Sequence, residues 1–171
     1  MNAKTLQALW DMQRMRHGIG TRCVELIPAD SIDAHPIPGM RSPKELIVHM
    51  YTFHRMGAEG IESGTMPGLD EKAACAAITT REQLLAYVNE CWERSHASMS
   101  KVTDVQLAAQ VGTPWGESYP AAAVVAMISD EYLHHRGQLY AYLRAFGIEP
   151  PMNWDFENNA AAFRPKEHAT S

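Results

Sequence analysis

The chain has 171 residues, of which 46% are hydrophobic, and 15 Lys and Arg stand against 20 Asp and Glu, for a formal net charge of −5. This length and composition are typical of one domain with a buried core, and they exclude a disordered, collagen-like or low-complexity protein. The acidic balance offers no general positive field for phosphate groups, so we expect no nucleic-acid partner.

Cysteine usage and hydropathy predict where the protein resides. Cys23, Cys75 and Cys91 are widely spaced, so they do not form the CxxC pairs of a zinc ribbon. The N-terminal segment lacks the apolar core of a signal peptide, and no apolar run approaches the ~18 residues that a membrane span needs. We therefore expect a cytoplasmic protein with free thiols and no membrane partner.

The first part of the chain predicts two long helices joined by an ordered loop. Apolar residues recur at helical spacing over residues 3–26, and the pattern ends before Pro28. Residues 28–41 are rich in proline and glycine, as loops are. The segment Ser42-Pro43-Lys44-Glu45 is a capping box with proline at the first helical position, so the second helix begins here and extends to about residue 61.

The rest of the chain predicts two further helices. After a loose connection over residues 65–77, a capping signal over residues 79–82 begins a third helix that extends to about residue 99. Residues 103–119 form another loop, and Pro120 begins a long fourth helix that Gly147 ends with a left-handed cap. We see no alternating pattern of the kind that strands show.

Four amphipathic helices in one domain predict an all-α fold, a four-helix bundle, with long loops between helices 1 and 2 and between helices 3 and 4. The long loops permit crossed connections, so the order of the helices stays open. We place the bundle in residues 1–151 and a C-terminal tail in residues 152–171. Trp154, Phe156 and Phe163 indicate that part of this tail packs on the bundle, and we expect about the last six residues to be loose.

The fourth helix carries the first candidate ligands. On a helical wheel centred on His135, Glu131 falls within about 40°, in the middle of the apolar stripe. An ionisable pair in a bundle core is costly unless it is bound to something. Because a histidine and a carboxylate one helical turn apart can both reach one ion, the pair predicts a metal site. His134 lies at the edge of the stripe, where it would face a substrate or a partner helix.

The second helix offers a third ligand. His49 shares a face with Leu46 and Phe53, whereas we place His54 on the far side, nearer to solvent. His49, Glu131 and His135 together would leave coordination positions open, as catalytic metal sites do. A hydrogen-bonded core histidine is the competing interpretation for each of the two histidines.

A di-iron site is a further alternative, because bundles of this class use two Glu-x-x-His motifs. The chain contains Glu93-Arg94-Ser95-His96 and Glu131-Tyr132-Leu133-His134. Glu93 points away from the apolar stripe of its helix, so this arrangement is disfavoured.

The chain resembles the DinB/YfiT-like superfamily over about residues 6–152. The resemblance rests on His134-His135-Arg136-Gly137-Gln138-Leu139, on Tyr142-Leu143-Arg144 and Gly147-Ile148-Glu149-Pro150-Pro151 after it, and on the upstream stretch from Ser42 to His49. It implies a bundle that is usually dimeric, with a three-histidine metal site at one end. Members with known activities include metal-dependent thiol transferases and a thiol-dependent maleylpyruvate isomerase.

The resemblance also assigns ligands. The second-helix histidine of the family corresponds to His49 and its last histidine to His135, while Glu131 occupies the position of the remaining one. This departure makes a site of two histidines and one carboxylate, which still suits zinc, nickel or iron. We predict interactions on the helix surface and between protomers for Arg136 and Gln138.

We therefore expect a metal-dependent enzyme that acts on a small molecule, either an S-transferase with a low-molecular-weight thiol as co-substrate or a hydrolase. An open-sided divalent ion would lower the pKa of water or a thiol, and His134 would act as a catalytic proton shuttle. Trp10, Gln13 and Tyr132 would line the substrate pocket. The alternatives are a non-catalytic, stress-related bundle that binds metal or ligand, and a structural homodimer in which Glu131 and His135 form a buried pair.

Overall fold

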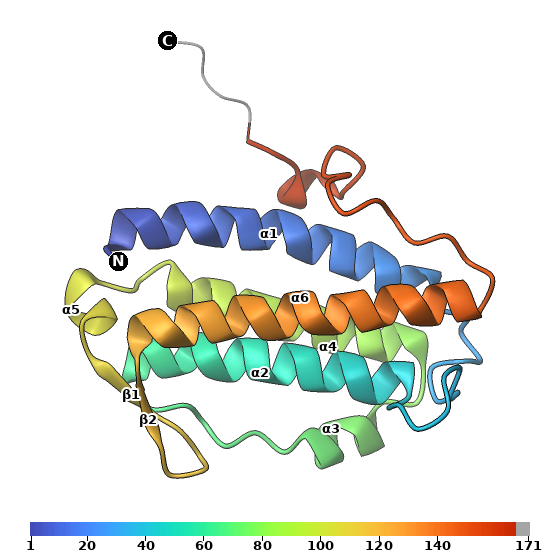
Figure 1. Ribbon diagram of the computed structural model, residues 1–171, viewed down its shortest axis with the longest axis horizontal. Helices are drawn as coiled ribbons and strands as arrows, with labels where there is room; N and C mark the ends of the chain where they lie inside the picture. The colour runs from blue at the N-terminus through green and yellow to red at the C-terminus, as the bar shows by residue number, and fades with distance from the viewer. Residues whose placement is uncertain (167–171) are drawn as a thin grey trace.

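The computed structural model describes residues 1–166 and shows four long helices with short elements between them (Figure 1). The elements are α1 (Ala3–Leu26), α2 (Pro43–Ser63), α3 (Glu71–Ala77), α4 (Arg81–Met99), α5 (Asp104–Leu107), β1 (Gln110–Gly112), β2 (Ser118–Pro120), α6 (Ala121–Ala145) and the 3₁₀ turn η1 (Ala161–Phe163). Among these residues, no helix is both long and apolar enough to cross a membrane. The predicted four-helix bundle is confirmed.

The long helices begin and end close to where their caps predict. The Ser42 hydroxyl accepts a hydrogen bond from the Glu45 amide, and the Glu45 carboxylate accepts one from the Ser42 amide, which completes the capping box. The box at α4 lies one residue later than predicted, between Thr80 and Gln83. Gly147 follows α6 with φ 77°, a conformation that favours glycine.

The helices are connected by crossed loops. Both α1 and α2 pack against α4 and against α6, so α1 lies diagonally opposite α2, and α4 lies diagonally opposite α6. Figure 1 shows that α1 runs parallel to α6 and that α2 and α4 run in the other direction. Simple up-down-up-down order is therefore absent. The loops after α1 and α4 are long because each crosses to a diagonal helix.

The loops contain short helices and strands that the sequence does not predict. Residues 65–77 include α3, and residues 103–119 include α5 and an antiparallel hairpin in which Val111 pairs with Tyr119. Thr65 forms a bridge to Gly112, which ties this hairpin to the end of α2. Each strand has three residues, too few to show an alternating pattern.

The C-terminal tail lies along α1. Asn159 is buried and donates hydrogen bonds to the carbonyls of Met15 and Phe163. Phe163 and Phe156 are partly buried against the core, whereas Trp154 is 64% exposed, contrary to the prediction that it packs. The residues predicted to be loose lie, from residue 167 onward, outside the described residues.

The interior contains a stack of aromatic rings between α1 and α4. The Trp92 ring is parallel to that of His17, with centroids 4.4 Å apart, and to that of Trp10, at 5.6 Å. Such rings bury large areas, and offset stacking stabilises them further. This stack fixes the spacing of α1 and α4.

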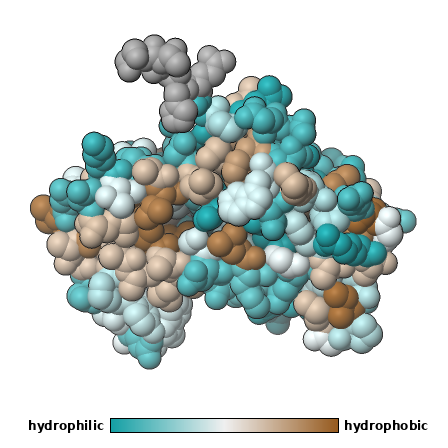
Figure 2. Space-filling view, turned by 45° about the horizontal axis from the view of Figure 1, so that its top comes forward, coloured by the Kyte–Doolittle hydropathy of each residue, from teal (hydrophilic) through white to brown (hydrophobic). Residues whose placement is uncertain are grey.

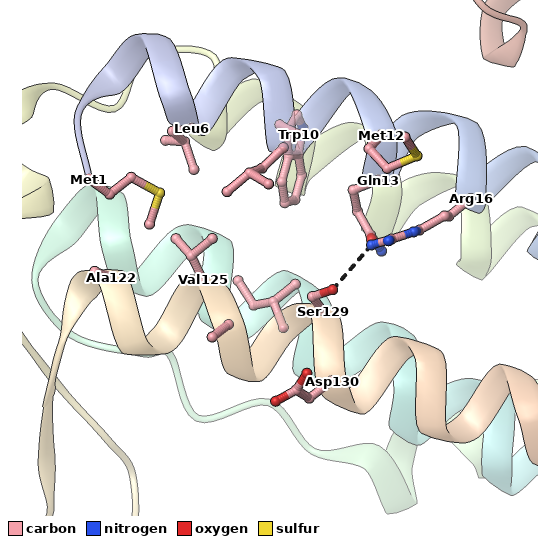
Figure 3. Close-up of a pocket in the computed structure, with 13 residues that line it drawn as sticks. Met1, Leu6, Trp10, Met12, Gln13, Arg16, Ala122, Val125, Ser129 and Asp130 are labelled. Atoms are coloured by element: carbon pink, nitrogen blue, oxygen red, sulfur yellow. Dashed lines mark hydrogen bonds between the residues drawn. The ribbon is translucent and has the colours of Figure 1, made fainter.

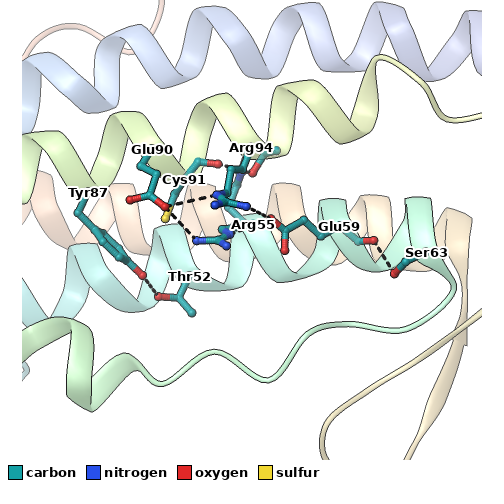
Figure 4. A network of polar contacts seen from close by, with 10 residues as sticks. Thr52, Arg55, Glu59, Ser63, Tyr87, Glu90, Cys91 and Arg94 are labelled. Atoms are coloured by element: carbon teal, nitrogen blue, oxygen red, sulfur yellow. Dashed lines mark hydrogen bonds and ion pairs between the residues drawn. The ribbon is translucent and has the colours of Figure 1, made fainter.

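Polar side chains, some buried and some exposed, join α2 to α4 (Figure 4). Arg55 Nη1 of α2 and Arg94 Nε of α4 lie 3.5 Å and 3.3 Å from Glu90 Oε1 of α4. Thr52 Oγ1 lies 2.6 Å from Tyr87 Oη. Exposed ion pairs contribute little free energy each, so the network mainly sets the alignment of the two helices.

Gly20 gives a test of this close packing. A methyl group at Gly20 would collide with Tyr132 Oη and lie 3.1 Å from Tyr51 Oη, whereas one at Gly137 on α6 would meet nothing within 4 Å. We expect Gly20→Ala to lower the free energy of unfolding by about 1–3 kcal/mol. Gly137→Ala should raise it by up to about 1 kcal/mol through helix propensity alone. Urea denaturation measures both, and equal stability of the two variants would contradict the packing.

Candidate metal centre

Three side chains converge between α2 and α6. His49 of α2 and Glu131 and His135 of α6, together called the His–Glu–His cluster below, each place one ligand atom within 4.8 Å of the others. Glu131 Oε2 lies 2.9 Å from His135 Nε2 and 3.8 Å from His49 Nε2. The two imidazole rings are nearly perpendicular, with centroids 4.9 Å apart. The structure thus brings together the three predicted metal ligands.

Local structure explains this convergence. The capping box at Ser42 fixes the start of α2, and His49 follows two turns later, on the side that packs against α6. Glu131 and His135 lie one turn apart and so share a face of α6. The His135 side chain is 6% exposed, whereas that of Glu131 is 40% exposed, so the cluster opens to solvent beside Glu131. Glu131 therefore lies at the edge of the buried stripe, not in its middle as predicted.

Each histidine of the cluster is held through its other nitrogen. His49 Nδ1 lies 2.9 Å and 3.0 Å from the carboxylate oxygens of Glu71, and His135 Nδ1 lies 2.9 Å from Gln138 Oε1. Because carboxylate and amide oxygens accept hydrogen bonds, both Nδ1 atoms carry the proton. Both Nε2 atoms then face Glu131, with that of His135 at hydrogen-bonding distance, and a metal ion would bind there in place of a proton. Outer partners of this kind orient metal-binding histidines and raise their basicity.

Neither outer partner is among the site residues that the sequence predicts. Glu71 begins the short helix α3, in a stretch predicted to be a loose connection. Gln138 was assigned to the helix surface and to contacts between protomers, although its spacing of three from His135 was a usable signal. Its neighbour Arg136 is 7% exposed, so the prediction of a surface role for Arg136 is wrong.

His134 lies at the rim of the cluster. It is exposed, its ring centroid lies 4.9 Å from that of His135, and its Nε2 lies 3.1 Å from Gln138 Nε2. The Gln138 amide therefore donates to His134 while its oxygen accepts from His135. The catalytic role of His134 stays a prediction, and this placement outside the ligand set is compatible with it.

Several other residues whose positions the sequence predicts are not part of the cluster. His54 is 1% exposed, so its placement near solvent is wrong, and its Nδ1 lies 2.9 Å from Ser95 Oγ. Tyr132 is completely buried and lines neither the cavity beside Glu71 nor the one between α1 and α6. Trp10 and Gln13 line the cavity between α1 and α6 (Figure 3), which is separate from the cluster. Glu93 is exposed, which agrees with the rejection of a di-iron site.

A cavity of about 310 Å³ lies beside the cluster, next to the outer partner of His49. Its lining residues are Arg41, Glu45, Glu71, Lys72 and Cys75. Burial raises the pKa of the Cys75 thiol, and it raises the pKa of Cys23 to about 12 and that of Cys91 to about 11. A raised pKa makes a thiol a poor nucleophile at neutral pH, so the protein has no activated cysteine among the described residues.

The comparison with protein families defines the class of this protein. The model of the DinB superfamily matches residues 13–139, which is most of the chain. The chain belongs to the DinB superfamily.

Solved structures show the same fold. YjoA of Bacillus subtilis, an uncharacterized protein, is 23% identical over 125 residues, which are 72% of this chain and 79% of YjoA. Its crystal structure matches with a TM-score of 0.66 over 81% of this chain and 91% of that chain.

Two further structures belong to proteins with described activities. YfiT of B. subtilis, described as a probable metal-dependent hydrolase with an unusual four-helix bundle topology, is 18% identical with a TM-score of 0.60, over 81% of this chain and 87% of YfiT. A mycothiol-dependent maleylpyruvate isomerase is 16% identical with a TM-score of 0.62, over 81% of this chain and 61% of the isomerase. At these identities the likeness shows the fold.

Proposed function

We propose that this protein is a metal-dependent enzyme that transfers a low-molecular-weight thiol to a small electrophile or hydrolyses a small substrate. The proposal rests on one observation: two Nε2 atoms and one carboxylate oxygen lie within 4.8 Å of one another, in a cluster that opens to solvent beside Glu131. Two proteins of this fold support parts of the proposal, since one is a probable metal-dependent hydrolase and the other is an isomerase that depends on the thiol mycothiol.

The donor set fits a divalent ion. Glu71 and Gln138 hold the Nδ1 protons of His49 and His135, so each ring would offer its Nε2 to an ion, and Glu131 adds one negative charge. Two imidazoles and one carboxylate suit zinc, nickel and iron, and three protein ligands leave positions for water or substrate. When bound, such an ion lowers the pKa of a coordinated thiol or water toward neutral pH.

The residues of this chain supply the remaining parts of the reaction. His134, exposed at the rim, would take up at its Nε2 the proton that a thiol or water releases, and this proton would replace the hydrogen bond that Gln138 donates there. The cavity beside Glu71 offers space for a small co-substrate, and its wall carries two basic groups, Arg41 and Lys72, and two acidic ones, Glu45 and Glu71. Since the three cysteines of the chain are not activated, thiol chemistry would need an external thiol.

Activity assays on the loaded protein test the proposal. The protein would be loaded with zinc, nickel or iron(II) in turn and assayed for transfer of 2-mercaptoethanol to 1-chloro-2,4-dinitrobenzene and for hydrolysis of p-nitrophenyl acetate. We expect one of the two activities above the blank, lost in His135→Ala and retained in His35→Ala, which changes an exposed histidine. Stoichiometric metal without turnover of related electrophiles and esters would instead support a non-catalytic metal-binding protein.

The outer partners give a second test. Glu71→Ala and Gln138→Ala remove the hydrogen bonds that hold His49 and His135, so each should weaken metal affinity by about 10–100-fold. Competition with a chromophoric chelator measures the dissociation constant. Glu149→Ala, which removes an exposed carboxylate on another part of the surface, should leave it unchanged. Equal affinities in all three variants would show that these partners do not orient the ligands.

A further inference from the structure

A groove between α1 and α6 forms a second cavity, separate from the His–Glu–His cluster. It has a volume of about 300 Å³, and no residue of the cluster lines it. Its walls are apolar and include Leu6, Leu9, Trp10, Val125 and Ile128. Figure 2 shows hydrophobic residues gathered in the left half of this face, where Figure 1 places the N-terminal ends of both helices. The volume is at the small end of ligand sites.

One end of this groove is polar and positively charged. Arg16 lines it and donates a hydrogen bond from Nη1 to Ser129 Oγ at 3.2 Å. Within residues 1–166, no carboxylate forms an ion pair with Arg16 or with the nearby, buried Arg136. Burial and the charge of Arg136 lower the pKa of Arg16. Two guanidinium groups without a counter-ion favour the approach of an anion.

Gln13 adds an unpartnered amide at the same end. It lines the groove, is 4% exposed, and neither its Nε2 nor its Oε1 has a hydrogen-bond partner among the described residues. A buried amide without partners costs free energy, so such groups usually mark a missing ligand or water. Figure 3 shows Gln13 and Arg16 side by side, both pointing from α1 toward α6.

The acidic residue of the groove does not neutralise this end. Asp130 also lines the groove, but its carboxylate points away from α1, and it forms no ion pair with a described residue. We propose that the groove binds a small organic acid, with its carboxylate at Arg16 and Gln13 and its apolar body between Trp10 and Val125. A planar carboxylate matches the donor fork of a guanidinium, and a single short chain fits the volume of the cavity.

Calorimetric titration with octanoate, 1-octanol and octylammonium tests this assignment. The three probes share one apolar body and differ in the charge of the head group. We expect octanoate to bind at least about tenfold more tightly than 1-octanol, and octylammonium to bind more weakly than both. Equal affinities for the three probes would overturn the proposal, because the groove would then recognise only apolar surface.

Variants test the two ends of the groove separately. Arg16→Met keeps the apolar stem and should reduce the affinity for octanoate to that for 1-octanol. Arg144→Met is the control: it removes an exposed arginine of α6 that does not line the groove, and it should leave the affinity for octanoate unchanged. Ala126→Phe fills the exposed mouth of the groove and should abolish binding of octanoate and of 1-octanol. If Ala126→Phe instead converted a dimer into a monomer and no probe bound to the wild type, the groove would be an interface between copies.

Gln13→Met separates a ligand-binding role from a structural one. Replacing an unpartnered amide with an apolar group of similar shape should not lower the melting temperature, while the affinity for octanoate should fall. A lower melting temperature with unchanged affinity would show that the amide holds a structural water. His135→Ala should still bind octanoate. If this variant no longer bound octanoate, the acid would bind at the metal cluster, and the proposal of a second site would be overturned.

Discussion

Replacing His135 with alanine is expected to remove the metal from the protein. His135 is the most buried member of the cluster, and Gln138 holds its ring with Nε2 toward Glu131. Changes to outer partners alone weaken metal sites by about 10–100-fold, so loss of this ligand should raise the dissociation constant by more than about 100-fold. The metal content measured by elemental analysis after dialysis should be about one ion per chain in the wild type and at the background in His135→Ala.

Matched variants show whether the loss is specific to the ligand set. Glu131→Gln removes the charge of the third ligand and should weaken binding, whereas Glu131→His keeps a ligand at that position and should retain the metal. His134→Ala should retain the metal, because His134 lies outside the ligand set, and should lose activity, because no side chain would then take up the released proton. Full metal content in His135→Ala would contradict the assignment of the cluster.

A second large effect is expected in acid. His17 and His54 are 0% and 1% exposed, and burial lowers the pKa of His54 to about 3 and that of His17 well below its ordinary value. The Ser95 hydroxyl donates to the Cys91 carbonyl at 2.7 Å, so it accepts from His54 Nδ1. The Nε2 of this neutral ring has no partner among the described residues, and protonation there would bury an unpaired charge.

The direction of the effect follows from proton binding. Below pH ~6.5 the unfolded chain protonates both histidines, while the folded protein keeps His54 neutral down to about pH 3. The free energy of unfolding therefore has its full value above pH ~6.5, where both histidines are neutral in either state, and it decreases as the pH falls below that value. Well below pH ~6.5, the loss approaches about 1.4 kcal/mol per pH unit for each histidine that stays neutral in the folded protein.

Urea denaturation at pH 7.5, 6 and 5, with a chelator present so that metal release does not contribute, measures this loss. His54→Asn keeps a donor for Ser95 and should remove about half of the pH dependence. His35→Asn, at an exposed position, serves as the control and should keep all of it. A free energy of unfolding that stays constant between pH 7.5 and pH 5 would show that the two buried histidines titrate normally in the folded protein.

Local signals predicted the long helices and the ligands well. Helix caps and glycine stops are short-range features, so the start of α2 at Ser42 and the end of α6 before Gly147 followed from the sequence. The spacing of Glu131 and His135 placed both on one face of α6, and the apolar face of α2 directed His49 toward it.

Features that depend on tertiary contacts could not be predicted in the same way. The helix α2 packs against both α4 and α6, so its buried arc is wider than one stripe, and a wheel argument placed His54 wrongly in solvent. Glu71 belongs to α3, a helix of seven residues without a buried face, so no periodicity marked it. The unpartnered amide of Gln13 appears only when α1 and α6 are placed side by side.

The most direct test of the metal site is X-ray absorption spectroscopy of the protein loaded with one equivalent of zinc. The structure predicts a first shell of nitrogen and oxygen only, with two imidazole rings, one carboxylate oxygen and positions for water. Glu131→His should then show three imidazole rings in the same shell. A sulfur atom in the first shell, or fewer than two imidazoles in the wild type, would contradict coordination by His49, Glu131 and His135.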